Sequence, residues 1–439
     1  MASDDVHFST TDREGCIRTG NNALLQVSGY SLDELVGQPQ GVLNHPSMPG
    51  AIFELLRERI SDGRPAVGYV QNRAKDGSDY WTFVAITSLS EGYLSIGLLP
   101  RSHYAATARK LYVELRTVEQ DARDAGGDPA AVAKLGADRI GGRLQRFGFD
   151  SYDRFMAEAL PTEITARSVI ARPESDPLPQ GPLGEVLGSA LALDGQLSAP
   201  VDHLDGYRDL SLSIASCSVS MMIASHQIAR AVGAVRGGAT RVAGDTSALR
   251  SIADSMKAPA EVVLNELQRL GLELDALRAQ VSELRVRIAL ARLNSEVMID
   301  FVREVLGGKS SLSAFAAVPV LCEALHESVA EMAVATVEVN DKLLLVGDGT
   351  TRAAQRLEQF RDFMAQWRTL AIRRGKSGEL GRELDTIDRQ LESCRGQLAE
   401  LRRVESRCRS EVVPVDVEAL AGPLTRMGEA SRPFLIARD

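Results

Sequence analysis

The chain has 439 residues, of which 44% are hydrophobic and 25% are charged, and its formal net charge is −9. This length allows two to four domains, and the acidic balance argues against general nucleic-acid binding, which favours a basic surface. The five cysteines are odd in number and form no CxxC pair. We therefore expect reduced thiols, and neither a disulfide framework nor a metal site.

The longest apolar-looking stretch runs from Leu210 to Val235, and six serines, His226, Gln227 and Arg230 interrupt it. These polar residues predict that the stretch does not span a membrane. The N-terminal residues have neither a basic start nor an apolar core, so we expect no secretory signal. Together these observations predict a cytoplasmic protein.

The first hundred residues carry a dense set of local folding signals. Ser31 and Glu34 have the spacing of a capping box, and Gly37 supplies a left-handed stop. An Asp76-Gly77 hairpin turn lies between two strand-like runs. We expect one helix and three strands, over residues 51–60, 67–72, 80–87 and 94–98. The prediction is a small α+β domain, with an antiparallel sheet and flanking short helices, that can enclose a small-ligand pocket.

The same region contains the words VSGYSLDELVG, NHPSMPGAIF and GYVQNRAKDGSDYW, in this order. It resembles PAS sensor domains of the aerotaxis-receptor type, whose pattern is close to VSGYxxxEL-G, RHPDMPxxxF and GxVKNRRKDGxxYWV. The resemblance covers residues 17–97 and implies a domain that senses redox state, oxygen or energy state. It implies a signal-transduction role for the chain as a whole.

The resemblance also implies candidate cofactor-binding residues. In flavin-binding members the Arg, His and Asp of RHPDMP support the dinucleotide; this chain keeps His45 but has Asn44 and Ser47 in place of the two charged groups. Asn21 matches a polar position at the pocket mouth, and Asn72 matches the Asn of KNRR. Amide side chains donate and accept hydrogen bonds, which suits the edge of a flavin. FAD is therefore the first candidate cofactor.

Other interpretations of these residues stay open. His45 is also a candidate haem ligand, since some sensor PAS domains bind haem through a histidine, or it packs the loop beside two prolines. Asn21 can cap the following helix, and Asn72 can satisfy a strand end. In these last cases the chain is a non-catalytic structural or interaction protein, and its PAS domain is an empty dimerisation module.

The rest of the sequence predicts helices. We divide the chain into a PAS domain (1–103), a helical connector (104–172), a Pro-rich linker (173–204) and a helical bundle or coiled-coil output region (205–439). Three apolar seams with steps of three and four run from Val263 to Ala291, from Leu325 to Trp367 and from Leu380 to Leu401. Gly347-Asp348-Gly349 is expected to break the second seam as a turn. Such seams pair within a chain or between chains, and their length favours a homodimer.

Two short sequence motifs in the helical region bear on the signalling output of the protein. The segment from Arg287 to Val305 resembles the LxLNAxIEAARAG word of chemoreceptors over about a dozen residues, with Asn294 on the Asn, which implies chemotaxis-type partners. The alternative is ordinary coiled-coil packing. His326-Glu327 looks like a kinase phosphoacceptor, but no nucleotide-binding word follows. The sequence also lacks GGDEF, EAL, Walker A, HExxH, GxSxG and GxGxxG words. We therefore predict a sensor that is not an enzyme.

Overall fold

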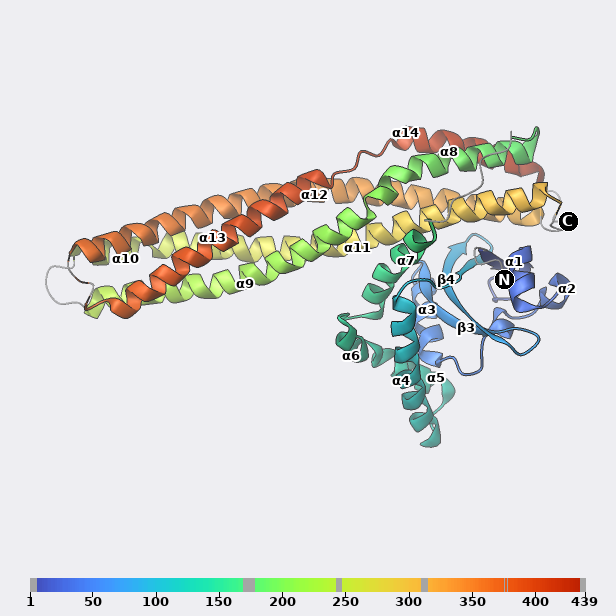
Figure 1. Cartoon of the computed structure of the whole chain (residues 1–439), viewed down its shortest axis with the longest axis horizontal. Coiled ribbons are helices and arrows are strands. Elements are labelled where there is room, and N and C mark those ends of the chain that lie inside the picture. The colour runs from blue at the N-terminus through green and yellow to red at the C-terminus, as the bar shows by residue number, and fades with distance from the viewer. Residues whose placement is uncertain are drawn as a thin grey trace. The chain divides into compact units, whose positions relative to one another are not determined.

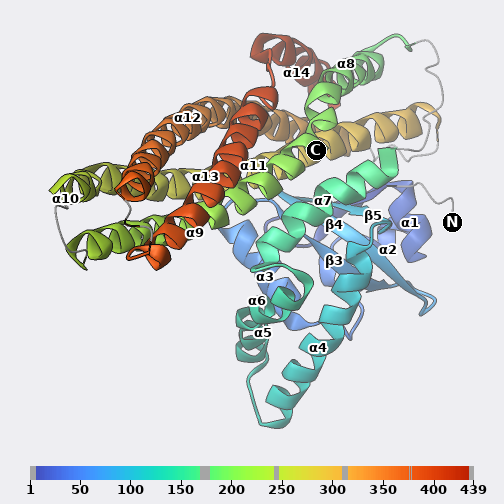
Figure 2. The same ribbon diagram turned by 60° about the vertical axis from the view of Figure 1, so that its left-hand side comes forward.

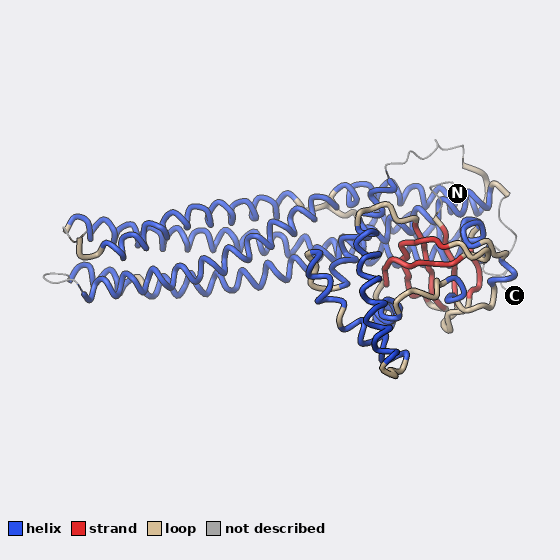
Figure 3. Tube along the Cα trace, turned by 60° about the horizontal axis from the view of Figure 1, so that its bottom comes forward, coloured by secondary structure: helices blue, strands red, loops and turns tan. Residues whose placement is uncertain are grey.

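The computed structural model describes residues 6–168, 178–241, 247–308, 315–374, 376 and 378–434. One sheet lies in the N-terminal part, and the remainder is helical (Figures 1 and 3). The strands are β1 (His7–Thr11), β2 (Ile17–Gly20), β3 (Ala66–Arg73), β4 (Asp79–Leu89) and β5 (Gly92–Leu98). The helices beside them are α1 (Asn22–Ser28), α2 (Leu32–Leu35), α3 (Gly50–Ser61), α4 (Tyr104–Asp124), α5 (Pro129–Asp138), α6 (Ile140–Leu144) and α7 (Tyr152–Ser168). The later helices are α8 (Pro182–Asp202), α9 (Leu204–Arg241), α10 (Ser247–Ser255), α11 (Lys257–Leu306), α12 (Ala317–Arg373), α13 (Gly381–Ser410) and α14 (Val417–Ser431).

The sheet has five antiparallel strands in the order β2-β1-β5-β4-β3. The predicted α+β fold, with a mostly helical remainder, is confirmed. The capping box forms, since the Ser31 amide donates to Glu34 Oε2 at 3.0 Å. The hairpin also forms, with Gly77 at a φ of +88°. The sequence did not predict β1 and β2, which complete the sheet beside β5.

Contacts between residues divide the chain into two compact units. The first comprises Met1–Val201, Arg285–Val334 and Asp416–Asp439, and the second comprises Asp202–Leu284 and Ala335–Val415. Both α11 and α12 are continuous helices with residues in each unit. Within the first unit these helices contact the sheet region: the Phe8 and Phe301 rings lie 5.0 Å apart, and the Ser90 amide donates to Glu323 at 2.7 Å.

The second unit is an antiparallel four-helix bundle of α9, α11, α12 and α13 (Figure 1). Polar contacts fix the neighbours: Ser218–Asp275 joins α9 to α11, Ser216–Glu400 joins α9 to α13, Arg352–Glu266 joins α12 to α11, and Arg402–Glu358 joins α13 to α12. The predicted seams supply the bundle core, since Leu270, Leu277, Leu343 and Leu401 are at most 1% exposed. Because one chain already buries them, seam length no longer argues for a homodimer.

Two expectations about helix boundaries were wrong. Gly347-Asp348-Gly349 does not form a turn, because α12 runs through it without a break. Gly349 lies close to α11, where an added Cβ would be 3.2 Å from Glu273 Oε2, so this glycine permits close helix packing. The Pro-rich linker was expected to extend to residue 204, but α8 occupies Pro182–Asp202 and begins at a proline, where the missing N–H costs nothing. Residues 173–177 of that linker lie outside the described residues.

Among the described residues, one helical segment, Pro182–Thr240, is long and apolar enough to cross a membrane, and 28% of its most apolar window is buried in the chain. A single such helix is weak support for a span, because a core helix of a soluble protein passes the same test. The expected absence of a membrane span therefore stays a prediction.

His7 on β1 should make the stability of the N-terminal domain depend on pH. Its ring lies over Gly97 of β5, where an added Cβ would be 2.0 Å from Nε2. Burial lowers the His7 pKa from 6.5 to about 4. The unfolded chain therefore binds a proton below about pH 6.5 that the folded chain does not bind until about pH 4. Stability should fall across this window as the pH falls, by at most about 3 kcal/mol.

Urea unfolding at pH 7.5, 6.0 and 5.0 measures this effect. The wild type should lose more stability across the series than His7→Gln, which has no group titrating at that position. Parallel pH profiles for the two proteins would contradict the assignment.

Candidate functional site

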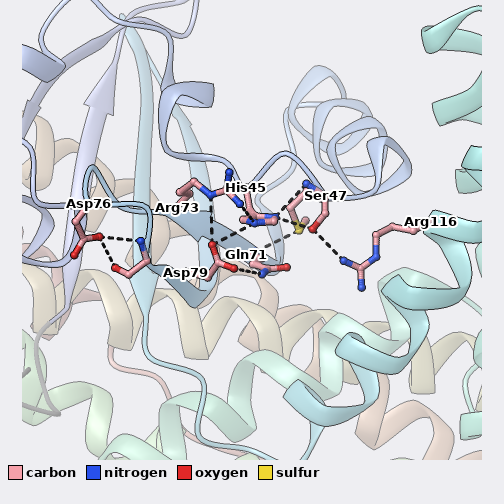
Figure 4. A network of polar contacts seen from close by, with 9 residues as sticks. His45, Ser47, Gln71, Arg73, Asp76, Asp79 and Arg116 are labelled. Carbon is pink, nitrogen blue, oxygen red and sulfur yellow. Dashed lines mark hydrogen bonds and ion pairs between the residues drawn. The ribbon is translucent and has the colours of Figure 1, made fainter.

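His45 lies in a network of polar side chains at the free edge of β3 (Figure 4). Its backbone N–H donates to Gln71 O at 3.0 Å, which holds the loop against the strand. Its Nδ1 lies 2.6 Å from Ser47 Oγ, and its Nε2 lies 3.2 Å from Asp79 Oδ1 and also contacts Arg73. Local pairing with the sheet edge therefore fixes the imidazole.

The two ring nitrogens of His45 have different neighbours. The Ser47 amide N–H donates to Nδ1 at 3.1 Å, so Nδ1 accepts there, whereas Nε2 lies beside both the Arg73 guanidinium, which can only donate, and Asp79 Oδ1, which can only accept. Arg116 of α4 donates to Ser47 Oγ at 3.0 Å. Ser, His and Asp are the residue types of hydrolytic triads, but here Ser47 shares Nδ1 with its own backbone amide in a local turn. The arrangement is a structural clamp between the loop, β3, β4 and α4.

The other predicted residues lie at two opposite edges of the sheet. Asn44 forms a bridge with Asn72 on β3, and Asn72 Nδ2 donates to Thr82 Oγ1 at 3.1 Å. Asn21 follows β2 at the far edge, about 19 Å away across four strand spacings. The structure brings His45, Asn44 and Asn72 to one edge and separates Asn21 from them.

Asn21 is fully engaged by backbone groups. Its Oδ1 accepts from Phe8 N at 3.0 Å and Leu24 N at 3.2 Å, and its Nδ2 donates to Val6 O at 2.7 Å. The side chain caps α1 and ties the start of β1 to it. A ligand would have to compete with all three hydrogen bonds.

Two hydroxyls of the sheet are among the buried side-chain groups that have no hydrogen-bond partner within the described residues: Tyr80 Oη on β4 and Thr19 Oγ1 on β2. Burial raises the pKa of Tyr80 well above its ordinary value, so this hydroxyl stays protonated. Tyr80 lies opposite Asn72 in the β3–β4 register, on the same face as Thr82. A buried hydroxyl without a partner costs about 1–3 kcal/mol, which a polar ligand would recover.

The opposite face of β3 and β4 is covered by α7. Tyr69 and Phe83 pair across the strands with ring centroids 4.8 Å apart, and Phe155 of α7 packs against Tyr69. Tyr69 Oη donates to Glu163 Oε1 at 2.7 Å. Glu163 also accepts from the amides of Arg101 and Ser102 at 2.7 and 3.1 Å and from Ser102 Oγ at 2.6 Å. This buried carboxylate joins the sheet, the β5–α4 junction and α7.

Helix α7 in turn contacts α11 (Figure 2 shows both helices). Arg285 Nη1 lies 2.8 Å from Glu158, and Arg285 is only 2% exposed. Arg167 lies 3.6 Å from Glu296. The chain of contacts therefore runs from Tyr69 on the sheet, through Glu163 and α7, to α11.

Three cavities in the first unit lie away from the predicted residues. The first, of about 420 Å³, is lined by Gly63, Thr87 and Ser88 and by Arg287, His326 and Glu331. A second, of about 30 Å³, lies beside Ser90 and Glu323, and a third, of about 580 Å³, lies between α3 and the start of α7. His45, Asn21, Asn44 and Asn72 line none of the three.

The relatives that follow match the N-terminal region of the chain. No family model matches the chain. The Escherichia coli protein "Aerotaxis receptor" is 38% identical over 120 residues, which are 26% of this chain and 24% of that protein. The Klebsiella pneumoniae "Nitrogen fixation regulatory protein" is 30% identical over 121 residues, 27% of this chain and 23% of that protein. The chain thus spans about a quarter of the length of these curated relatives.

Solved structures match the same part of the chain. A PAS domain from Colwellia psychrerythraea is 22% identical, covers 22% of this chain and 88% of its own, and gives a TM-score of 0.21. The dark structure of the blue-light photoreceptor Aureochrome1 LOV is 22% identical, covers 24% of this chain and 82% of its own, and gives a TM-score of 0.22.

Proposed function

Since the N-terminal region is a PAS domain of the aerotaxis-receptor type, we propose that the chain is a cytoplasmic signal-transduction protein. The domain senses redox, oxygen or energy state through a small ligand, and the helices relay the result. The match to the aerotaxis receptor carries this proposal. The relay includes a homodimer and chemotaxis-type partners, and no catalytic step.

FAD is the cofactor that we propose for the domain, with haem second. Asn72 and Tyr80 would face the heterocycle from the sheet, because both lie on one face and the Tyr80 hydroxyl needs a partner. Arg73 and Arg116, beside His45, bring positive charge to the β3 edge, which suits a phosphate. Bound flavin would supply redox chemistry, and the residues of this chain would bind and orient it.

We propose that the signal leaves the PAS domain through the contact between Tyr69 and Glu163. A change in the ligand would shift β3 and β4, and Tyr69 would carry the shift to Glu163 and α7. The ion pairs from α7 to Arg285 and Glu296 would then bias α11. A buried carboxylate with four partners has few alternative positions, so it transmits small displacements well.

The absorption spectrum of the purified full chain tests the cofactor, followed by a matched pair of variants. Flavin gives near-ultraviolet and blue bands, and haem gives a Soret band. Tyr80→Phe should lower the cofactor-to-protein ratio, because losing one hydrogen bond of about 1–3 kcal/mol weakens binding roughly 5- to 150-fold. Tyr69→Phe removes a hydroxyl from the other face and should leave the ratio unchanged.

Other variants separate the remaining candidates. Asn72→Ala should also lower the ratio, whereas His45→Ala should do so only if the clamp at the β3 edge contacts the ligand. Far-UV circular dichroism controls for folding. If the wild type takes up neither flavin nor haem on reconstitution, the result would favour the alternative function, a non-catalytic interaction protein whose PAS module is empty.

A further inference from the structure

Helix α9 carries an outward face without charge. The sequence has no Asp, Glu, Lys or Arg between Asp209 and Arg230, a stretch of 20 residues that is about 30 Å long as a helix. Its inward side is buried in the bundle, as Ile214, Cys217 and Met221 are at most 2% exposed. Four large apolar side chains point outward and are 59%, 52%, 59% and 47% exposed: Leu212, Val219, Met222 and Ile223.

The apolar surface continues onto α11. Ser218 Oγ donates to Asp275 at 3.1 Å, and one turn farther on each helix lie Met222 and Leu272. Leu272 is 74% exposed. We call these five residues, Leu212, Val219, Met222, Ile223 and Leu272, the α9 patch. Together they expose on the order of 500 Å², the size of the largest patch on a typical monomer, and such patches are often functional.

Opposite charges bracket the α9 patch. Asp205, Leu212 and Val219 follow one another at steps of seven, and so do Ile223 and Arg230, which places all five on one side of the helix. Asp205 and Arg230 are both exposed. The N-terminal end of the face carries Asp205 and Asp209 with Arg208 between them, a net charge of −1, and its C-terminal end carries Arg230.

We propose that the α9 patch binds the same patch on a second copy of this chain, with the two α9 helices antiparallel. In that register Asp205 lies opposite Arg230 of the partner subunit, and Leu212 lies opposite Ile223 of the partner subunit. A parallel pair would place like charges opposite each other, so the charges select the antiparallel orientation.

The charges of the neighbouring helices argue against a bilayer as the occupant. Ser216 of α9 donates to Glu400 of α13 at 2.7 Å, and Asp209 lies 3.7 Å from Arg407. On the other flank, Asp275 of α11 accepts from Ser218. Immersing α9 in hydrocarbon would carry these charges to the bilayer, which is costly. A second copy covers the apolar strip and leaves the charged flanks in water.

The area sets the expected strength of this dimer. The α9 patch is smaller than the about 800 Å² that each partner contributes to a standard stable interface. The flanking charges add specificity more than affinity. We therefore expect a dimer that dissociates in the micromolar range.

The mass of the full chain against concentration, by analytical ultracentrifugation, is the first test. The wild type should pass from monomer to dimer, and Val219→Lys at the centre of the patch should weaken dimerisation at least tenfold. Leu345→Lys is the matched control, since Leu345 on α12 is 50% exposed but lies outside the patch. Unchanged thermal melting should show that both variants are folded.

A charge exchange tests the orientation. Asp205→Arg and Arg230→Asp should each weaken the dimer, because each places like charges opposite one another. The double variant should restore it, since both contacts re-form with reversed sign. If both single variants weaken dimerisation and the double variant does not restore it, the antiparallel register is wrong.

Two further results would overturn the inference as a whole. One is a wild type that stays monomeric at hundreds of micromolar, or a dimer that Leu345→Lys disrupts and Val219→Lys does not. The other is flotation of monomeric wild type with phosphatidylcholine–phosphatidylglycerol vesicles that Val219→Lys abolishes, which would make the face a membrane surface. The α9 patch would supply the interface of the homodimer in the proposed function. Dimerisation is measured as molecular mass and cofactor binding as absorbance, so either one can fail without the other.

Discussion

Replacing Leu270 and Leu277 together with lysine is expected to unfold the four-helix bundle. Both leucines are at most 1% exposed, in the core formed by α9, α11, α12 and α13. Each lysine must either bury an ammonium group without a partner or force the helices apart. The combined cost should be at least about 5 kcal/mol, which is comparable to the whole stability of many domains. Far-UV circular dichroism during thermal melting should show a large loss of helix at low temperature.

Val262→Lys is the control for this prediction. Val262 lies on the same helix but is 47% exposed, so the added charge stays in water and the melting temperature should change little. If the double variant melted like this control, the assignment of the seam to the bundle core would be wrong.

Glu163→Ala should destabilise the N-terminal domain by about 3–5 kcal/mol. Glu163 is 2% exposed and accepts hydrogen bonds from Tyr69, Ser102 and the amides after β5. Its removal leaves several buried donors without an acceptor, and each costs about 1–3 kcal/mol with partial relaxation. Urea unfolding followed by near-UV circular dichroism, which reports on the aromatic cluster around Tyr69, would measure the loss.

Two variants calibrate the Glu163 result. Tyr69→Phe removes a single donor and should cost only about 1 kcal/mol. Asp121→Ala removes an exposed carboxylate from α4 and should be close to neutral. A Glu163→Ala protein as stable as Asp121→Ala would show that the carboxylate does not hold the sheet to α7.

The sequence predicted those features of the N-terminal domain that form through interactions between residues close together in the chain. Ser31 and Glu34 need only each other to form a capping box, and Asp76-Gly77 needs only its own backbone freedom to turn the chain. The same holds for Asp128, which caps α5 ahead of Pro129. In each case the interacting groups lie within a few residues of one another.

The features that the sequence did not predict depend on distant residues. Strand β1 is short and carries Ser9, Thr10 and Thr11 in a row, without apolar alternation, and it forms by pairing with β5 more than eighty residues later. The helix through Gly349 persists because α11 packs closely there and supplies tertiary contacts that outweigh the low helix propensity of glycine.

The candidate site shows the same division. The sequence identified Asn72 and His45 by residue type, but their distance from Asn21 depends on strand order, which one sequence does not reveal. Tyr80 is partly buried on β4. Its hydroxyl without a partner becomes visible only when every donor nearby has been placed.

The first unit is built from three separate segments of chain, and the last of them is Asp416–Asp439. Ribosomes deliver a protein from its N-terminus at about 5–20 residues per second. The sheet can therefore form early, whereas the unit that contains it is not complete until α14 has been made. Helix α14 lies in the third of these segments, so it is made after the other parts of the first unit. Completion of the first unit therefore waits for the third of its three segments, long after the strands of the sheet have been made.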